Sequence, residues 1–259
     1  MESKSILSQQ ADGVLILTFD RPKANALDVP MAETLLAELE RAHADSAVRC
    51  VLLIGRGRFF SAGQDVGTIA TATPEVVRSE LRRVYNRLIL RLRRLDKPVV
   101  AAINGPAAGA GLGLALATDV RIAGQRARFV FGFSALGLTA DSGVSLLLPA
   151  LIGLARAADM AFLEESLTAE QALAYGLVHR VVPDDELAEA AAAEAGRLAL
   201  GPTRAFALTK QAFNRGVLAD LEDCLELEAG LQASAVGTSD AREGVKAYLE
   251  KRPPHFRGA

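Results

Sequence analysis

Short, almost wholly apolar runs alternate in the first half of the chain with segments whose apolar residues recur every three or four positions. The runs Gly13–Phe19, Cys50–Gly55 and Val99–Asn104 have the pattern of strands that are buried on both faces. Residues 29–45 and Glu75–Leu95 have helical spacing. Strands that alternate with helices form crossover units, so we expect an α/β fold with parallel strand pairing.

The second half continues this rhythm with two short predicted strands, "DVRIAG" and "ARFVFG", and then becomes helical. Thr168 and Gln171 are spaced as a capping box at a helix start, and Gly176 suits its end. From Asp184 onward the pattern is almost wholly helical, and Pro202 fits the first turn of one of these helices. Amphipathic helices need an apolar surface to cover, on their own core or on another subunit.

The composition narrows the class of protein. The chain has 259 residues, 50% hydrophobic and only 5% aromatic, which is enough to bury one large core. A formal net charge of -2 argues against a general nucleic-acid-binding surface. Cys50 and Cys224 are isolated in the sequence, so neither a disulfide framework nor structural zinc is expected. The segment "MESKSILSQQADG" lacks a signal-peptide layout, and we expect a cytoplasmic protein.

Two stretches have the length and low charge of membrane spans. Val99–Thr118 carries no charge, and Phe129–Gly153 carries only Asp141. Glycine and proline interrupt both stretches, and neither is the continuous apolar run that a simple spanning helix needs. We expect both to lie in the core of the protein.

The single ionisable side chain of the second stretch, Asp141, needs an explanation. A buried, unpaired carboxylate is costly, so such a group is usually exposed at a turn, hydrogen-bonded or functional. The surrounding "TADSG" has turn chemistry, and Asp141 could cap the helix that "SGVSLLLPALIG" predicts. Taken alone, this stretch favours a turn or a helix cap over catalysis.

Two glycine-rich loops are candidates for binding an anionic or polarised oxygen. "FFSAGQD" and "NGPAAGAGLG" each follow a predicted strand and introduce a helix. Small residues let backbone N–H groups approach a ligand, and two such loops could aim two amides at one carbonyl oxygen as an oxyanion hole. Tight packing between helix and strand is the alternative for each loop. Neither is a phosphate-binding Walker loop or a dinucleotide fingerprint.

The predicted helix Glu75–Leu95 is rich in arginine. Arg83, Arg87, Arg91 and Arg94 share one face through spacings of three and four. A solvated face is the simplest interpretation, and a site for ligand phosphates is the alternative. RNA binding ranks below both because no aromatic interleaving or nucleic-acid motif accompanies the arginines.

Together these segments resemble the crotonase, or enoyl-CoA hydratase/isomerase, superfamily over nearly the whole chain. The matching segments are "DRPKANAL", "FFSAGQDV", "KPVVAAINGPAAGAGLGLALATDVRIA", "LTAEQALAYGLVHRVV" and "AREGVKAYLEKRPPHF". The resemblance implies a crotonase-like spiral of βα repeats with the acyl-CoA site in residues 1–195, and a helical trimerisation region in residues 196–259. It also implies acyl-CoA substrates and a homotrimer or dimer of trimers. No metal or redox cofactor, nucleic acid or membrane partner is expected, since coenzyme A would enter as part of the thioester.

The resemblance also assigns roles to individual positions. The backbone N–H groups of Gln64 and Ala110 match the oxyanion-hole donors of the family. The positions that match coenzyme A contacts are Lys23, Ala24, Ala26, Ala62, Asp65, Val66, Tyr248 and Lys251, and the last two match positions that can reach the coenzyme A of an adjacent subunit.

The chain departs from the hydratase pattern at both catalytic positions. Where typical hydratases carry two glutamates, this sequence has Gly113 and Phe133, and neither can transfer a proton. Asp141 instead matches an aspartate that does acid–base work in the branch containing ring-epoxide phenylacetyl-CoA isomerases, although Ala140 replaces the proline usual there. A related dehalogenase branch uses the matching aspartate as a nucleophile.

With this resemblance, catalysis becomes the favoured role of Asp141. The expected activity is that of an acyl-CoA isomerase that shifts a double bond or rearranges an unsaturated or epoxidised ring. The alternatives are an enoyl-CoA hydratase with an unusual proton donor and a noncatalytic CoA-binding protein.

Overall fold

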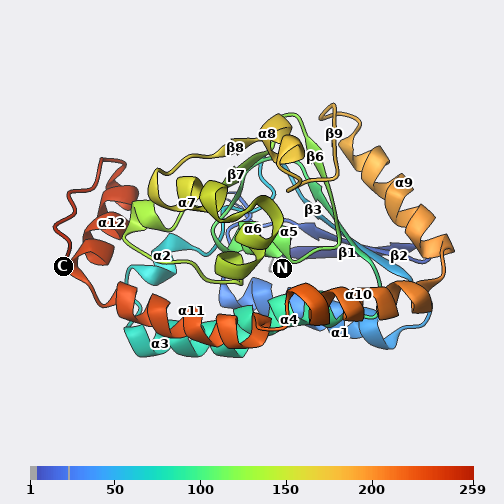
Figure 1. The fold of residues 1–259 in the computed structure, drawn as a ribbon, viewed down its shortest axis with the longest axis horizontal. Coiled ribbons are helices and arrows are strands. Elements are labelled where there is room, and N and C mark those ends of the chain that lie inside the picture. The colour runs from blue at the N-terminus through green and yellow to red at the C-terminus, as the bar shows by residue number, and fades with distance from the viewer. Residues whose placement is uncertain (1–4, 23) are drawn as a thin grey trace.

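The computed structural model describes residues 5–22 and 24–259, and its centre is a six-stranded sheet (Figure 1). In spatial order the strands are β1 (Ile6–Ala11), β2 (Val14–Phe19), β3 (Cys50–Gly55), β4 (Val99–Ile103), β6 (Val120–Gly124) and β9 (Arg180–Val182). Every pairing from β2 to β9 is parallel, which confirms the crossover prediction. β1 was not predicted, and it pairs with β2 as an antiparallel hairpin. Asp12 and Gly13 form its turn with positive φ angles of 51° and 79°.

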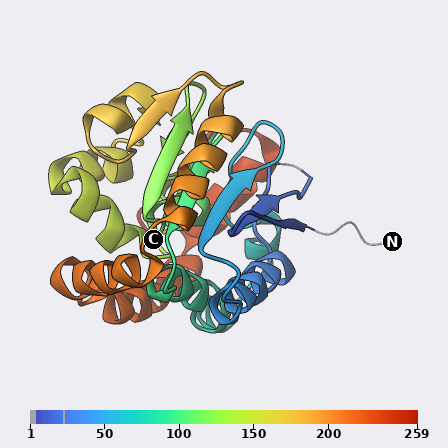
Figure 2. The same ribbon diagram turned by 90° about the vertical axis from the view of Figure 1, so that its right-hand side faces the viewer.

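Both faces of the sheet are buried at β2, β3, β4 and β6, which explains why these strands lack polar alternation. Cys50 and Leu52 of β3 face α9 (Leu187–Leu200), where they pack with Ala191 and other alanines. α9 crosses one face of the sheet in Figure 2. Val51 and its alternate neighbours point into the main core on the other side.

Helices from both ends of the sequence form a layer along the lower side of Figure 1. They are α1 (Val29–Ala44), α3 (Pro74–Glu80), α4 (Asn86–Arg94), α10 (Thr203–Val217) and α11 (Leu221–Val236). A π-helical turn, η1 (Leu81–Tyr85), joins α3 to α4, so the helix predicted at Glu75–Leu95 is confirmed with an irregular centre.

The remaining elements lie above this layer and at the C-terminal end of the molecule in Figure 1. The helical ones are α2 (Val66–Ile69), α5 (Ala110–Leu116), η2 (Ser134–Leu136), α6 (Val144–Ile152), α7 (Leu154–Phe162), α8 (Ala169–Ala174) and α12 (Ser239–Glu250). A small second sheet contains β5 (Ala107–Ala108), β7 (Arg128–Val130) and β8 (Leu167–Thr168). The capping box of Thr168 and Gln171 is confirmed at the start of α8. The expected domain boundary between residues 195 and 196 falls within α9 and stays a prediction.

The two stretches of low charge form core elements. Val99–Thr118 contributes β4, β5 and α5, while Phe129–Gly153 contributes part of β7, η2 and α6. In the part of the chain that the structure describes, no helix has the length and apolar character needed to cross a membrane.

The arginine-rich face is an ion-paired surface. Arg83 lies 3.1 Å from Glu33 of α1, and Arg91 lies 2.7 Å from Glu40 of the same helix. Arg94 pairs with Glu222 of α11. These pairs favour the interpretation as a solvated face over a free cationic site for phosphate or RNA.

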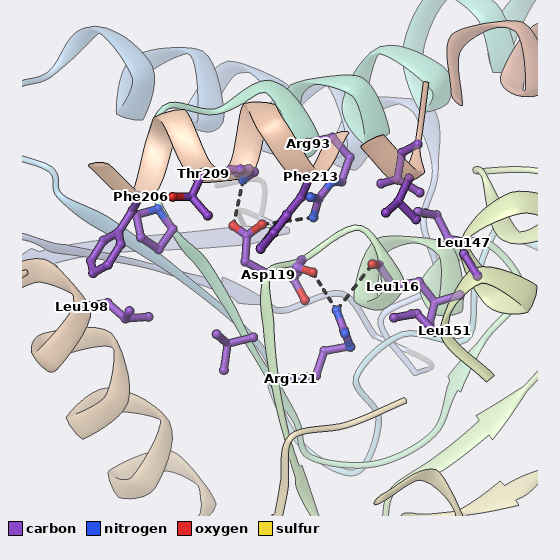
Figure 3. Close-up of a pocket in the computed structure, with 17 residues that line it drawn as sticks. Arg93, Leu116, Asp119, Arg121, Leu147, Leu151, Leu198, Phe206, Thr209 and Phe213 are labelled. Atoms are coloured by element: carbon purple, nitrogen blue, oxygen red, sulfur yellow. Dashed lines mark hydrogen bonds and ion pairs between the residues drawn. The ribbon is translucent and has the colours of Figure 1, made fainter. Parts of the chain in front are cut away.

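Asp119, immediately before β6, joins three distant parts of the chain. Its carboxylate accepts hydrogen bonds from Arg93 of α4 (3.0 Å), Lys210 of α10 (2.8 Å) and the backbone N–H of Val99 (2.9 Å). Figure 3 shows Arg93 and Asp119 facing each other beside Arg121. The guanidinium of Arg121 is buried and donates to backbone carbonyls, and burial lowers its pKa to about 10. This cluster fixes α10 to the sheet.

The substitution Asp119→Asn is expected to lower the free energy of unfolding by about 3–5 kcal/mol, because Arg93 and Lys210 would stay buried without their anionic partner. Glu33→Gln is the matched control: it removes the exposed partner of Arg83 and should cost less than about 1 kcal/mol. Denaturant unfolding followed by circular dichroism measures both. Equal losses in the two variants would contradict the anchoring role of Asp119.

Candidate active site

The loop that follows β3 is paired with the loop that follows β2. Leu27 donates its N–H to the carbonyl of Gly63 (2.7 Å) and accepts the N–H of Asp65 (2.9 Å). In a parallel bridge of this kind, the residue between the two partners points its own N–H to the opposite side. That residue is Gln64, so its amide faces away from the β2 loop.

The second predicted amide belongs to Ala110, the first residue of α5. The first N–H groups of a helix have no partner inside the helix. The carbonyl of Ser61 accepts the N–H of Ala108 (3.0 Å), which brings the loop before α5 against the loop of Gln64. A Cβ atom on Gly63 would lie 3.2 Å from the nitrogen of Ala110, and Gly63 has a φ angle of 85°. Glycine at this position therefore lets the backbones that carry the two amides meet, as a pair of oxyanion donors requires.

The carboxyl group of Asp141 is buried and held at both oxygens. Ser142 Oγ donates to Oδ1 (2.8 Å), and Gln232 Nε2 donates to Oδ2 (3.0 Å). Burial raises the pKa of Asp141 to about 7, against the two hydrogen bonds and with the help of the nearby Glu228 charge. Asp141 can thus exist as base or acid near neutral pH.

The interpretation of Asp141 as a helix cap is wrong. The N-cap residue of α6 is Gly143, which has no side chain to offer. Glu228 of α11 takes this role, because its carboxylate accepts the N–H groups of Gly143 (2.7 Å) and Ser145 (2.9 Å). The carboxyl group of Asp141 therefore has no capping function.

Glu228 and Gln232 were missed in the sequence. They lie one turn apart on α11, within a stripe whose other buried members include Leu225 and Ala229. Two polar residues inside an otherwise apolar helical stripe were the available signal.

Neither position that matches a hydratase glutamate carries an acid group, and position 113 has no room for a side chain. A Cβ atom at Gly113 would lie 2.6 Å from the carbonyl oxygen of Ser142 and 2.7 Å from its Cβ. Phe133 is buried, packs edge-on against Phe131 with ring centres 5.0 Å apart, and lies beside Gly109. The neighbourhood of the predicted amides is therefore apolar where a hydratase has carboxylates.

Tyr85 is a second buried polar group near the two loops, and no sequence pattern marked it as a site residue. It ends the π-helical turn η1, a type of irregularity that often marks functional sites. Its hydroxyl lies 3.5 Å from the carbonyl oxygen of Leu27. Burial, followed by the charge of Asp141, raises the pKa of Tyr85, while a hydrogen bond with the Gln64 side chain lowers it.

The positions predicted to contact coenzyme A fall into two groups. Ala62 donates its N–H to the carbonyl of Ala24 (3.0 Å). The loop that contains Ala24 and Ala26 therefore lies against the loop that contains Ala62, Asp65 and Val66. Lys23, predicted with them, lies outside the described residues.

Asp65 has a structural role besides the predicted one. Its carboxylate pairs with Arg21 (2.8 Å) and accepts the N–H of Gly67 (3.0 Å) at the start of α2. Tyr248 and Lys251 are exposed at the C-terminal end of α12. α12 packs against α2, and a groove of about 770 Å³ lies between α12 and residues 69–74.

The cavity drawn in Figure 3 lies elsewhere. It encloses about 390 Å³ beside the Asp119 cluster, and Leu147, Leu151, Phe206 and Phe213 are among its apolar walls. None of the described positions predicted for catalysis or for coenzyme A lines it. Among the described residues, no cluster of three or more His, Cys, Asp or Glu could hold a metal ion.

The family model and the relatives that match this chain all point to one protein family. The model of the enoyl-CoA hydratase/isomerase family matches residues 9–259. The chain is 43% identical over 257 residues to 1,2-epoxyphenylacetyl-CoA isomerase of Escherichia coli (strain K12), covering 98% of each. It is also 43% identical over 259 residues to a probable enoyl-CoA hydratase of Rhodobacter capsulatus, covering 100% of each. Overall identity therefore does not choose between the two reactions.

A solved structure confirms the crotonase-like fold expected from the sequence. The structure of an enoyl-CoA hydratase from Mycobacterium avium subsp. paratuberculosis K-10 is 37% identical to this chain, with a TM-score of 0.89 and coverage of 98% of each chain.

The substitution Gly113→Ala is expected to destabilise the protein by about 1–3 kcal/mol, because the new methyl group meets the backbone of Ser142 in a packed site. Gly196→Ala is the matched control in α9, where a Cβ atom meets nothing within 4 Å. The control should be neutral or stabilising by up to about 1 kcal/mol. Denaturant unfolding of both variants compares them, and a neutral Gly113→Ala variant would show that the turn at Ser142 yields easily.

Proposed function

Because the chain belongs to the enoyl-CoA hydratase/isomerase family, we propose that it is an acyl-CoA isomerase that shifts a double bond or rearranges an unsaturated or epoxidised ring. The observation that carries the proposal is the buried carboxyl of Asp141, with a pKa near 7, in a site where Gly113 and Phe133 replace the two hydratase glutamates.

The N–H groups of Gln64 and Ala110 polarise the thioester carbonyl in the proposed mechanism. As a proton leaves the substrate, negative charge moves onto this oxygen, and fixed amide donors stabilise it without reorganising. Removal of one such donor typically costs about 2.7–4 kcal/mol of transition-state stabilisation. The loops of both amides are held by the backbone pairing at Leu27 and Ala108.

Asp141 is the proton shuttle of the proposed mechanism. As a carboxylate it removes a proton from one carbon, and as the resulting acid, once this proton has exchanged with the solvent, it delivers a proton to another carbon. The double bond moves and the substrate gains no atoms. A pKa near 7 suits both half-reactions, because neither protonation state is strongly disfavoured at neutral pH.

A hydratase remains the second candidate, supported by the equal identity to the Rhodobacter capsulatus relative. That reaction would need water to be activated without a carboxylate at position 113 or 133. A noncatalytic CoA-binding protein is the third candidate, and it would use the two loops for binding alone.

The test is mass spectrometry of the products formed from 3-enoyl-CoA and 2-enoyl-CoA in deuterated water. Double-bond movement with deuterium incorporation is expected, and Asp141→Asn should slow it by about 10²–10⁴-fold, the usual contribution of a general acid–base. Asp159→Asn, an exposed aspartate of α7, is the matched control. Addition of a whole water molecule would favour the hydratase. Tight binding of CoA with no proton exchange in either substrate would favour the noncatalytic protein.

A homotrimer or dimer of trimers is proposed as the assembly. In support, Phe213 and Val217 of α10 are each 64% exposed at the cavity of Figure 3, and Leu154 at the start of α7 is 76% exposed. Large apolar side chains exposed to this degree favour contact with another subunit. Sedimentation velocity should give a trimer or hexamer for the wild type and smaller species for Phe213→Asp. A monomeric wild type would contradict the proposal.

A further inference from the structure

We propose that Glu228 and Gln232 of α11 are positioning residues that orient Asp141 and govern its affinity for a proton. The inference rests on the proposed function of Asp141 as the proton shuttle. Both residues are 2% exposed, and both contact the segment from Thr139 to Ser145.

Gln232 has only one possible orientation of its amide. Its Oε1 accepts the N–H of Thr139 (3.1 Å), so its Nε2 must be the atom that faces Asp141 Oδ2 at 3.0 Å. A donor fixed in this way favours the ionised carboxylate. Because Ser142 Oγ holds Oδ1, the carboxyl group is fixed at both oxygens.

Glu228 holds the backbone turn that carries Asp141. Ser142 and Gly143 follow Asp141 with φ angles of 55° and 77°, and the left-handed region is unfavourable for serine. Glu228 accepts the N–H of Gly143 at one oxygen, and at the other the N–H of Ser145 (2.9 Å) and its Oγ (2.6 Å). The strained turn is thus secured by a carboxylate from another helix.

The two α11 residues act on Asp141 in opposite directions. The negative charge of Glu228 raises the pKa of Asp141, whereas the hydrogen bond from Gln232 lowers it. From the other packed elements, Tyr85 of η1 is the ionisable group near Asp141, because α5, η2 and α6 contain no ionisable side chains. Glu228, which binds the turn after Asp141, is therefore the carboxylate whose charge acts on it.

This opposition gives a test that a purely structural role would not pass. The kcat/KM of the isomerase reaction should rise with pH as Asp141 loses its proton. Gln232→Met removes the donor, which should move this rise to higher pH by about 0.5–1 unit, the equivalent of one hydrogen bond. Glu228→Gln removes the charge and should move the rise to lower pH. Glu226→Gln, on the exposed side of α11, is the control and should leave the profile unchanged.

A measurement without turnover separates this inference from the proposed function. In protein with ¹³C-labelled aspartate carboxyl groups, the NMR signal that Asp141→Asn removes reports the titration of Asp141. Its midpoint should shift upward in Gln232→Met and downward in Glu228→Gln. If the midpoints shift in this way but the wild type isomerises neither enoyl-CoA, the proposed function fails while the control of proton affinity stands.

Midpoints that do not move, or that move in the same direction, would overturn the inference even in an active isomerase. Near-ultraviolet circular dichroism checks that each variant is folded. If Glu228→Gln does not fold, Gln232→Glu replaces it, because its carboxylate keeps the contact with Thr139 and adds a negative charge beside Asp141. The midpoint should then rise further than in Gln232→Met, and a lower one would refute the inference.

Discussion

The carboxylate of Asp119 binds Arg93, Lys210 and the N–H of Val99, and through them it ties α10 to α4 and to the sheet. Buried charged groups need partners at hydrogen-bond distance. The contacts of Asp119 therefore favour one arrangement of α4, α10 and the sheet. With α10 fixed there, the next helix, α11, runs along α3 and reaches the turn of Asp141. The environment of the candidate catalytic group thus depends on a carboxylate outside the candidate active site.

Asp119 and Asp141 show how the same side chain acquires different properties. Asp119 has two cationic partners, whereas Asp141 has neutral donors in Ser142 and Gln232 and an anionic neighbour in Glu228. Because no cation lies beside Asp141, burial has the largest effect on its carboxyl group and raises its pKa to about 7. Neutral hydrogen-bond donors thus fix the carboxyl group of Asp141 in place, and no positive charge beside it stabilises the ionised form.

The sequence pattern predicted β2, β3, β4, β6 and the first helices well, because their apolar spacing is local, whereas the short β9 was not predicted. β1 was missed because five of its six residues are exposed and it has no apolar run, although Asp12 and Gly13 marked its hairpin. Asp141 stood out as the one charge in an apolar stretch, and the resemblance to a family implied the role that is proposed for it. Its partners could not be found in that way, since Gln232 lies 91 positions from Asp141 and Glu228 lies 85 from Gly143. The cap of α6 was assigned to Asp141 for the same reason. The N–H groups of Gly143 and Ser145 lie close to Asp141 in the sequence, but the carboxylate that accepts them belongs to Glu228 of α11.

The contact between Gly113 and Ser142 has a consequence for how such sites can evolve. The space that a side chain at position 113 would need is occupied by the backbone that positions the carboxyl of Asp141. A substitution at 113 that precedes any change at 142 would displace the turn that carries the proposed proton shuttle, so the exchange of an aspartate-based site for a glutamate-based one is costly by independent steps. Residues 113 and 142 are therefore expected to be epistatic, and the two chemistries to be separated on this backbone by concerted rather than gradual substitution.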